Sequence, residues 1–281
     1  MVKVLHPGFY TTIQDLGRKD YQHLGVPISG AMDLHAHRIA NALLGNGEDC
    51  ATLEITMVGP KLEFSCDTTI SITGAILSPQ INGKPIGLNI AINISKGDEL
   101  SFSKIQKGFR GYLAVYRGFQ TEVVLNSRSM YQGITKSSYV KKGDVLKIEQ
   151  KNHSNKKYSS IKLNEDYLDS SVIEVFKGPE FDKLNDLQIQ SLFNKEFTIS
   201  KDNNRMAYQL NELIKNDFKD IITSLVLPGT IQLTPSGKLI VLMRDSQTTG
   251  GYPRVLQLKE TSINAMAQKF TGNKITFKLL S

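Results

Sequence analysis

The sequence predicts a mainly β protein with a few short helices. Short β-branched stretches bounded by Gly, Pro, Asn or Asp recur along all 281 residues, whereas helical periodicity is confined to a few places. Hydrophobic residues make up 40% of the chain and charged residues 22%, which is typical of a folded protein and excludes a disordered one. Strands in this pattern favour barrels or sandwiches over a βαβ sheet.

The expected strands are rich in residues that fit a pleated surface. In chain order they cover residues 69–73, 90–94, 99–102, 112–116, 145–148, 172–176, 230–233, 239–243, 255–258 and 275–277. A helix is expected over residues 33–44, because Ala36, Ile39, Ala40 and Leu43 repeat at helical spacing and Gly45 can end it. Two further helices are expected over residues 182–193 and 262–270.

A lysine-rich stretch near residues 150–160 is the natural boundary between two domains. The segment Lys96-Gly97-Asp98-Glu99-Leu100 has an echo in Lys142-Gly143-Asp144-Val145-Leu146, which suggests a duplication. We therefore expect a first domain over residues 1–155 and a second over residues 156–281.

Charge and hydropathy exclude several classes of protein. The net charge of +7 is spread evenly, with 16 basic against 13 acidic residues in 1–150 and 18 against 14 in 151–281, so no nucleic-acid partner is expected. Apolar runs reach only about five residues, far short of a membrane span. Without a secretory signal, the protein is expected to be cytoplasmic, with Cys50 and Cys66 reduced.

The common catalytic signatures are absent. The sequence has no P-loop, no G-x-S-x-G, no H-E-x-x-H, no G-x-G-x-x-G and no Ala-Met-Lys-Met biotin motif. No metal site is expected, because His35 and His37 would lie roughly 200° apart on a helix. A nucleotide or biotin site must therefore be of another kind or belong to another chain.

Polar residues gather in the N-terminal segments 11–18 and 25–33. Gln14, Asp15 and Arg18 form either a surface turn or a carboxylate site, in which Arg18 anchors the anion and Asp15 orients it or acts as general base. Ser29 or Asp33 is expected to cap the following helix, whose N-terminus could also bind an anion.

A second polar segment, residues 245–253, lies near the C-terminus. Gln247, Thr248 and Thr249 bring amide and hydroxyl groups just before Gly250-Gly251, where a ligand could approach the backbone closely. This pattern fits a hydrogen-bonded β-turn and a binding loop for a small polar amide or carboxylate equally well.

Taken in order, seven stretches resemble the allophanate hydrolase subunit 2 family of biotin-dependent carboxyltransferase-like proteins. They are residues 12–18, 25–33, 38–41, 53–56, 204–206, 228–232 and 247–253. The resemblance implies two cyclophilin-like β-barrel subdomains. From the polar clusters and this resemblance together, we expect Asp15 or Glu54 as the catalytic base. The residues expected to bind substrate are Gln14, Arg18, Ser29, Asp33, Asn41, Arg128, Gln247, Thr248, Thr249 and Tyr252, with Arg18 or Arg128 as the anion anchor.

Free-standing members of this family include the C subunits of prokaryotic 5-oxoprolinase, which cleaves 5-oxo-L-proline to L-glutamate with ATP. The resemblance therefore implies two partners. One is a homologous B subunit, similar to allophanate hydrolase subunit 1, and the other is a lactam-utilisation A subunit. ATP, with Mg, is expected to be bound by the complex and not by this chain alone.

Three departures and two alternatives accompany this resemblance. Ala207 stands where members usually have Gly, Thr223-Ser224 where they have Ser-Glu, and Arg244 where they have a small residue, which weakens the inference of catalysis more than that of fold.

The chain could instead be the carboxyltransferase component of a biotin-dependent urea or allophanate system. It could also be a regulatory binding protein that antagonises an inhibitor of a histidine kinase.

Overall fold

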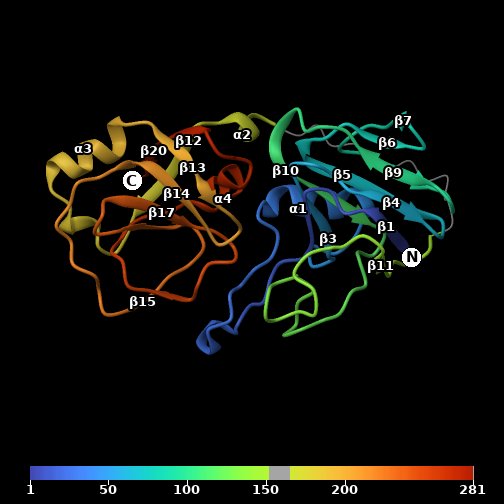
Figure 1. Cartoon of the computed structure of the whole chain (residues 1–281), viewed down its shortest axis with the longest axis horizontal. Coiled ribbons are helices and arrows are strands. Elements are labelled where there is room, and N and C mark those ends of the chain that lie inside the picture. The colour runs from blue at the N-terminus through green and yellow to red at the C-terminus, as the bar shows by residue number, and fades with distance from the viewer. Residues whose placement is uncertain (152–164, 281) are drawn as a thin grey trace. The chain divides into compact units, whose positions relative to one another are not determined.

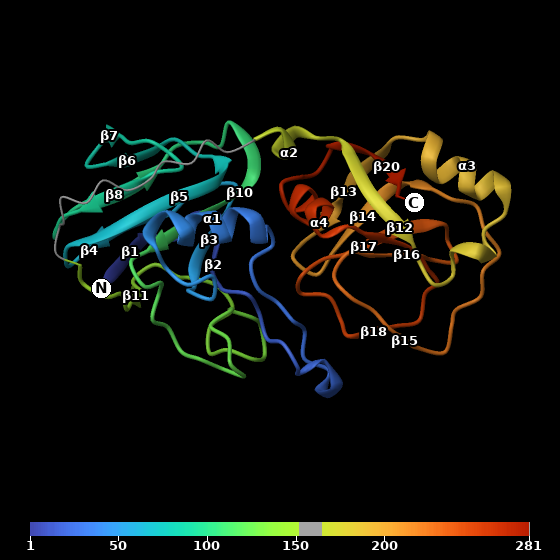
Figure 2. The same cartoon turned by 180° about the vertical axis from the view of Figure 1, so that it is seen from behind.

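A computed structural model describes residues 1–151 and 165–280 of the chain as two compact units (Figures 1 and 2). The first unit combines Met1–Arg18 with Ser29–Leu168, and the second combines Lys19–Ile28 with Asp169–Ser281. The boundary expected between residues 155 and 156 lies outside the described residues, as does part of the lysine-rich stretch.

The described strands of the first unit form two sheets. The six-stranded sheet has the order β11-β1-β4-β9-β6-β7, and the five-stranded sheet has the order β2-β3-β10-β5-β8. The strands are β1 (Val2–His6), β2 (Tyr10–Gln14), β3 (Thr52–Thr56), β4 (Lys61–Phe64), β5 (Thr68–Ile76), β6 (Pro79–Ile81), β7 (Lys84–Pro85), β8 (Ala91–Ile94), β9 (Glu99–Phe102), β10 (Lys107–Val115) and β11 (Val145–Leu146).

Alternation along the strands divides the five-stranded sheet into an apolar and a polar face. On one face Ile13, Leu53 and Leu113 join a core cluster that also contains residues of the other sheet, such as Val4 and Phe64. The intervening positions on the other face are mostly polar: Thr12, Gln14, Thr52, Glu54, Ser71 and Thr73. All six of these side chains are buried. We call this second surface the polar face.

Helix α1 (Leu34–Leu44) packs against the polar face, beside β3, β5 and β10 (Figures 1 and 2). The hydroxyl groups of Ser71 and Thr73 donate to the backbone oxygens of Ala40 and Ala36, at 2.6 and 2.7 Å. Asp33 caps the N-terminus of the helix, and Gly45 ends it in the left-handed conformation. The predicted helix over residues 33–44 is confirmed.

The second unit contains a closed barrel with strand order β12-β19-β16-β17-β14-β13-β20. These strands are β12 (Val172–Lys177), β13 (Phe197–Asn203), β14 (Ala207–Leu213), β16 (Thr230–Leu233), β17 (Lys238–Leu242), β19 (Arg254–Leu258) and β20 (Lys274–Leu279). Strand β20 closes the barrel, because it pairs in parallel with β12 and antiparallel with β13. Strands β15 (Ser224–Leu225) and β18 (Thr249–Gly250) form a separate small sheet.

Short helices complete the described chain: η1 (Gln22–Leu24), α2 (Asp166–Asp169), η2 (Phe181–Lys183), α3 (Asp186–Asn194) and α4 (Glu260–Ala267). The helix expected to start at residue 182 starts four residues later, because Asn185 and Gln188 form a capping box at that point. The helix expected over residues 262–270 ends earlier, at Ala267. The mainly β prediction is confirmed, and each expected strand overlaps a strand of the structure.

None of the described helices combines the length and apolar character that a bilayer crossing requires. Cys50 and Cys66 are both free cysteines.

Candidate active site

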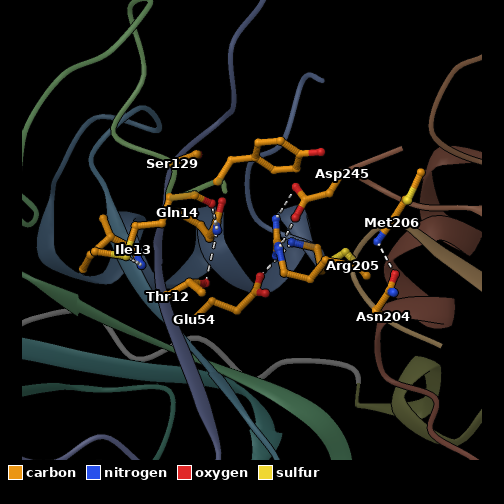
Figure 3. Close-up of polar contacts among 12 residues, drawn as sticks. Thr12, Ile13, Gln14, Glu54, Ser129, Asn204, Arg205, Met206 and Asp245 are labelled. Atoms are coloured by element: carbon orange, nitrogen blue, oxygen red, sulfur yellow. Dashed lines mark hydrogen bonds and ion pairs between the residues drawn. The ribbon is translucent and has the colours of Figure 1, made fainter. Parts of the chain in front are cut away.

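Strand register places the polar side chains of the first unit in two cross-strand rows. Thr12 of β2 and Tyr112 of β10 both pair with Glu54 of β3, so the three side chains lie in one row of the polar face. Gln14 pairs with Thr52 in the next row. Figure 3 shows Thr12, Gln14 and Glu54, with the amide of Gln14 donating to the Thr12 hydroxyl at 3.1 Å.

Glu54 is a buried carboxylate, 1% exposed, with polar neighbours at both oxygens. Its Oε2 accepts hydrogen bonds from the backbone N–H of Met32 and from the Tyr112 hydroxyl, each at 2.8 Å. Its Oε1 lies 3.7 Å from Nε of Arg110. These partners offset part of the cost of burying the carboxylate.

Tyr112 supplies a neutral hydroxyl at this position. Burial, followed by the charge of Glu54, raises the pKa of Tyr112 well above its ordinary value. The phenol therefore stays protonated and donates to Glu54, while its oxygen accepts from the backbone N–H of Asp33 at 2.8 Å. Tyr112 is not predictable from local sequence, because only the register of β10 against β3 shows that it faces Glu54.

Asp33 links the helix cap to the polar face. One carboxylate oxygen accepts from the backbone N–H of Ala36 at 3.0 Å, and the other accepts from the hydroxyl of Tyr167 at 2.8 Å. Burial and the adjacent Asp33 charge raise the pKa of Tyr167, so this hydroxyl is also a permanent donor. The capping role expected for Asp33 is confirmed.

Asp15 organises a loop that lies far away in the sequence. Its Oδ1 accepts from the backbone N–H of Gly17 at 2.8 Å and from the hydroxyls of Ser127 and Ser129 at 2.7 and 2.6 Å. Its Oδ2 accepts from the backbone N–H of Arg128 at 2.6 Å. Four donors on one carboxylate favour a positioning role for Asp15 over that of a general base.

The two polar segments at the N-terminal end of the chain pack against each other. The backbone N–H of Ala31 donates to the carbonyl of Asp15 at 2.9 Å. Gly30 has φ 88°, and a Cβ there would lie 2.9 Å from the backbone nitrogen of Gly17. Only glycine fits this approach, so the pairing of the two segments depends on Gly30.

The other expected binding residues of the first unit bond to nearby backbone. Arg18, 0% exposed, donates to the carbonyl of Ser129, and Arg128 donates to the carbonyl of Thr121. The amide of Asn41 donates to the carbonyl of Cys50 at 2.8 Å. These contacts hold loops and the C-terminal end of α1 in place, and they direct both guanidinium groups toward backbone carbonyls.

The segment 247–253 belongs to the second unit. Thr249 lies on β18 and is exposed, and the carbonyl of Thr248 accepts from the backbone N–H of Val226 at 3.1 Å. Tyr252 is 36% exposed. The segment therefore pairs as a short strand with residues 224–226, and its amide and hydroxyl groups remain candidates for binding.

A buried ion pair precedes this segment. Arg205 and Asp245 form a bidentate pair with distances of 2.8 and 3.0 Å, which Figure 3 shows beside Asn204 and Met206. The unusual Arg244 has its own partner, since its guanidinium donates to the carboxylate of Glu260. Asn204 accepts from the backbone N–H of Ala207 at 3.1 Å, so the position where members usually have Gly lies in an ordered turn.

His37 is the buried histidine of α1. Its two ring nitrogens lie 2.9 Å from the Thr52 hydroxyl and 2.9 Å from the carbonyl of Glu48, and burial lowers its pKa. Within residues 1–151 and 165–280, no group of three or more His, Cys, Asp or Glu side chains could hold a metal ion. His37 is therefore a neutral, hydrogen-bonded part of the helix packing.

Comparison with known proteins gives a consistent set of relatives. Residues 24–279 match the family model described as carboxyltransferase domain, subdomain A and B. The chain is 31% identical to the C subunit of 5-oxoprolinase from Escherichia coli (strain K12), over 99% of this chain and 90% of that protein. It is 29% identical to the protein of the same name in Haemophilus influenzae, over 100% and 92%.

The solved structures show the same likeness at the level of the fold. The urea amidolyase of K. lactis superimposes with a TM-score of 0.89 at 28% identity. The match covers 100% of this chain and 19% of that protein, so the chain spans about a fifth of its length.

Proposed function

The chain belongs to the carboxyltransferase domain family of subdomains A and B, and from this premise we propose that it is one subunit of an ATP-dependent 5-oxoprolinase. The observation that carries the proposal is similarity along nearly the whole length of two relatives that are named as the C subunit of 5-oxoprolinase. The reaction proposed is hydrolysis of 5-oxo-L-proline to L-glutamate, carried out with two partners: a homologous B subunit and a lactam-utilisation A subunit.

The polar face of the first unit supplies groups that suit this chemistry. A five-membered lactam resists hydrolysis, and phosphorylation of its amide oxygen by ATP would make the ring carbonyl carbon open to attack by water. The buried carboxylate of Glu54 is the proposed general base for that water, with Tyr112 and Arg110 as its neighbours. Ring opening then releases the amine and carboxylate of glutamate, with ADP and phosphate as the other products.

The phosphates of ATP are proposed to bind to the complex and not to this chain alone. The sequence has no P-loop whose backbone N–H groups could hold them. This chain therefore contributes the polar face to the complex that binds the nucleotide.

Reconstitution with and without this chain tests the proposal. The chain is combined with its B and A partners, and ADP and glutamate are measured with and without 5-oxo-L-proline. We expect 5-oxoproline-dependent formation of both products only when this chain is present. Undiminished glutamate formation by the two partners alone would show that the proposal is wrong.

The structural likeness to urea amidolyase supports a second candidate, the carboxyltransferase component of a urea or allophanate system. In that reaction the carboxyl group would come from carboxybiotin on a separate carrier, because this sequence lacks a biotin attachment motif. The test is urea-dependent loss of the carboxyl group from a carboxybiotinylated carrier. Transfer to urea, without any 5-oxoproline-dependent glutamate, would favour this candidate over the first.

A further inference from the structure

The three consecutive backbone N–H groups of residues 31–33 have three different acceptors. The first donates to the carbonyl of Asp15 at 2.9 Å. The second donates to Oε2 of Glu54 and the third to the hydroxyl oxygen of Tyr112, each at 2.8 Å. The donor residues are Ala31, Met32 and Asp33, all of them fully buried. This short segment therefore contacts both Glu54 and Tyr112 through groups whose direction the backbone fixes.

The hydroxyl hydrogen of Tyr112 points at Glu54. A backbone N–H can only donate, so the phenol oxygen accepts from Asp33 and the phenol hydrogen is available for Glu54. The hydroxyl lies 2.8 Å from Oε2 of Glu54, and the tyrosine is 0% exposed. Tyr112 of β10 also pairs with Glu54 of β3 in the strand register, so the backbone holds the two side chains opposite each other.

Oε2 of Glu54 consequently holds two donors, the N–H of Met32 and the hydroxyl of Tyr112. The last torsion of a glutamate side chain has broad minima, so the carboxylate turns easily unless its oxygens are held. A general base must lie within hydrogen-bond reach of the proton that it takes, so the orientation of the carboxylate matters for its action. Of the two donors, only Tyr112 comes from a side chain that a single substitution can remove.

We propose that Tyr112 is a positioning residue for the hydrolysis, because its hydroxyl holds the Glu54 carboxylate in the orientation in which it acts as base. This inference rests on the proposed function and extends it to a residue that acts through another. The Tyr112 hydroxyl should therefore matter for turnover only while residue 54 is a base. Loss of orientation slows the reaction of bound substrate and leaves substrate binding nearly unchanged.

The first test measures kcat and KM for 5-oxo-L-proline with the complex of this chain and its B and A partners. Tyr112→Phe removes the hydroxyl and keeps the ring. We expect kcat to fall about 10- to 100-fold, as for the loss of one hydrogen bond to a carboxylate, and KM to change less than about 3-fold. The matched control is Tyr208→Phe, at a tyrosine that is also 0% exposed and donates to the carbonyl of Lys269, and it should keep the wild-type kcat.

A double-mutant cycle separates positioning from a purely structural role. In a chain that carries Glu54→Gln, the addition of Tyr112→Phe should lower kcat by less than about 2-fold, because no base is left to be oriented. A structural role would lower kcat by the same factor with and without Glu54→Gln. That result would overturn the inference.

Amide hydrogen exchange of the full chain, followed by NMR without the partners, tests the geometry itself. In the wild type, the N–H groups of Met32 and Asp33 should exchange at least about 100-fold more slowly than in an unstructured peptide. Tyr112→Phe should speed exchange about 10-fold or more at Asp33, which loses its acceptor, and at Met32, whose acceptor becomes mobile. Exchange at Ala31, which donates to Asp15, should change less than about 2-fold. Unprotected Met32 and Asp33 in the wild type would overturn the inference even if the variant failed to fold.

The two kinds of measurement also separate this inference from the proposed function. Glutamate formation at the wild-type rate by a Tyr112→Phe complex would refute the positioning role and leave the function intact. A wild-type complex that forms no glutamate would refute the function, while the exchange rates would still decide whether Tyr112 holds Glu54 in place.

Discussion

Replacement of Asp15 by Asn should loosen the loop that its carboxylate holds. In the wild type, Oδ1 accepts from Gly17, Ser127 and Ser129, and Oδ2 accepts from the backbone N–H of Arg128. An amide has only one oxygen. If that oxygen stays with the three donors, the new NH₂ group faces the N–H of Arg128, and two donors meet without an acceptor.

The magnitude follows from the bonds that change. The lost bond to Arg128 is worth about 1.5–3 kcal/mol because its acceptor is charged, and the other three bonds become weaker because the charge is gone. We therefore expect Asp15→Asn to lower the free energy of unfolding of the first unit by about 3 kcal/mol, with about 1.5 kcal/mol as the lower bound.

Urea unfolding of the full chain measures this loss, with separate transitions allowed for the two units. Tyrosine fluorescence and circular dichroism are suitable probes, because the sequence has 10 Tyr and no Trp. The control is Asp49→Asn, an exposed aspartate of the same unit, which should change the free energy by less than about 0.5 kcal/mol. A loss below about 1 kcal/mol for Asp15→Asn, with unchanged hydrogen exchange at the Arg128 amide, would refute this reasoning.

Two further predictions concern the same unit. Burial lowers the pKa of His37 below 6.5, so near this pH the unfolded chain binds more protons than the folded chain. The free energy of unfolding of the wild type should therefore be highest above pH 6.5 and fall as the pH drops. In urea titrations His37→Gln should flatten this pH dependence, whereas the control His35→Gln, at an exposed position, should not. Gly30→Ala would bring Cβ to 2.9 Å from the backbone nitrogen of Gly17. In thermal unfolding it should lower the free energy of unfolding by at least about 2 kcal/mol more than the control Gly83→Ala, whose Cβ would meet nothing within 4 Å. Equal losses in the two variants would contradict the close packing at Gly30.

Local sequence pattern was sufficient for much of the fold. Short β-branched stretches bounded by turn-forming residues predicted the strands at residues 69–73 and 112–116, and the spacing from Ala36 to Leu43 predicted α1. Strand β3 was not predicted, because Glu54 interrupts its apolar pattern with a buried charge. Its burial depends on partners from other elements, which a local pattern does not contain.

The candidate site was less predictable than the fold. Motif order singled out Gln14, Asp15 and Glu54, but their different environments depend on long-range contacts. Asp15 meets Ser129 across 114 positions of the chain, and Tyr112 reaches Glu54 across 58. Sequence motifs therefore identify Asp15 and Glu54 as candidate site residues. Only the strand register and the loop contacts show that Asp15 positions a loop while Glu54 lies on the polar face.

The central claim is that the polar face of the first unit takes part in the chemistry through Glu54. Its most direct test is glutamate formation by the reconstituted complex that carries Glu54→Gln, an exchange of similar shape that removes the basic oxygen. The account predicts a fall of about 10²- to 10⁴-fold in the rate, with Glu63→Gln on β4 as a control that keeps full activity. A folded Glu54→Gln complex that forms glutamate at the wild-type rate would contradict it.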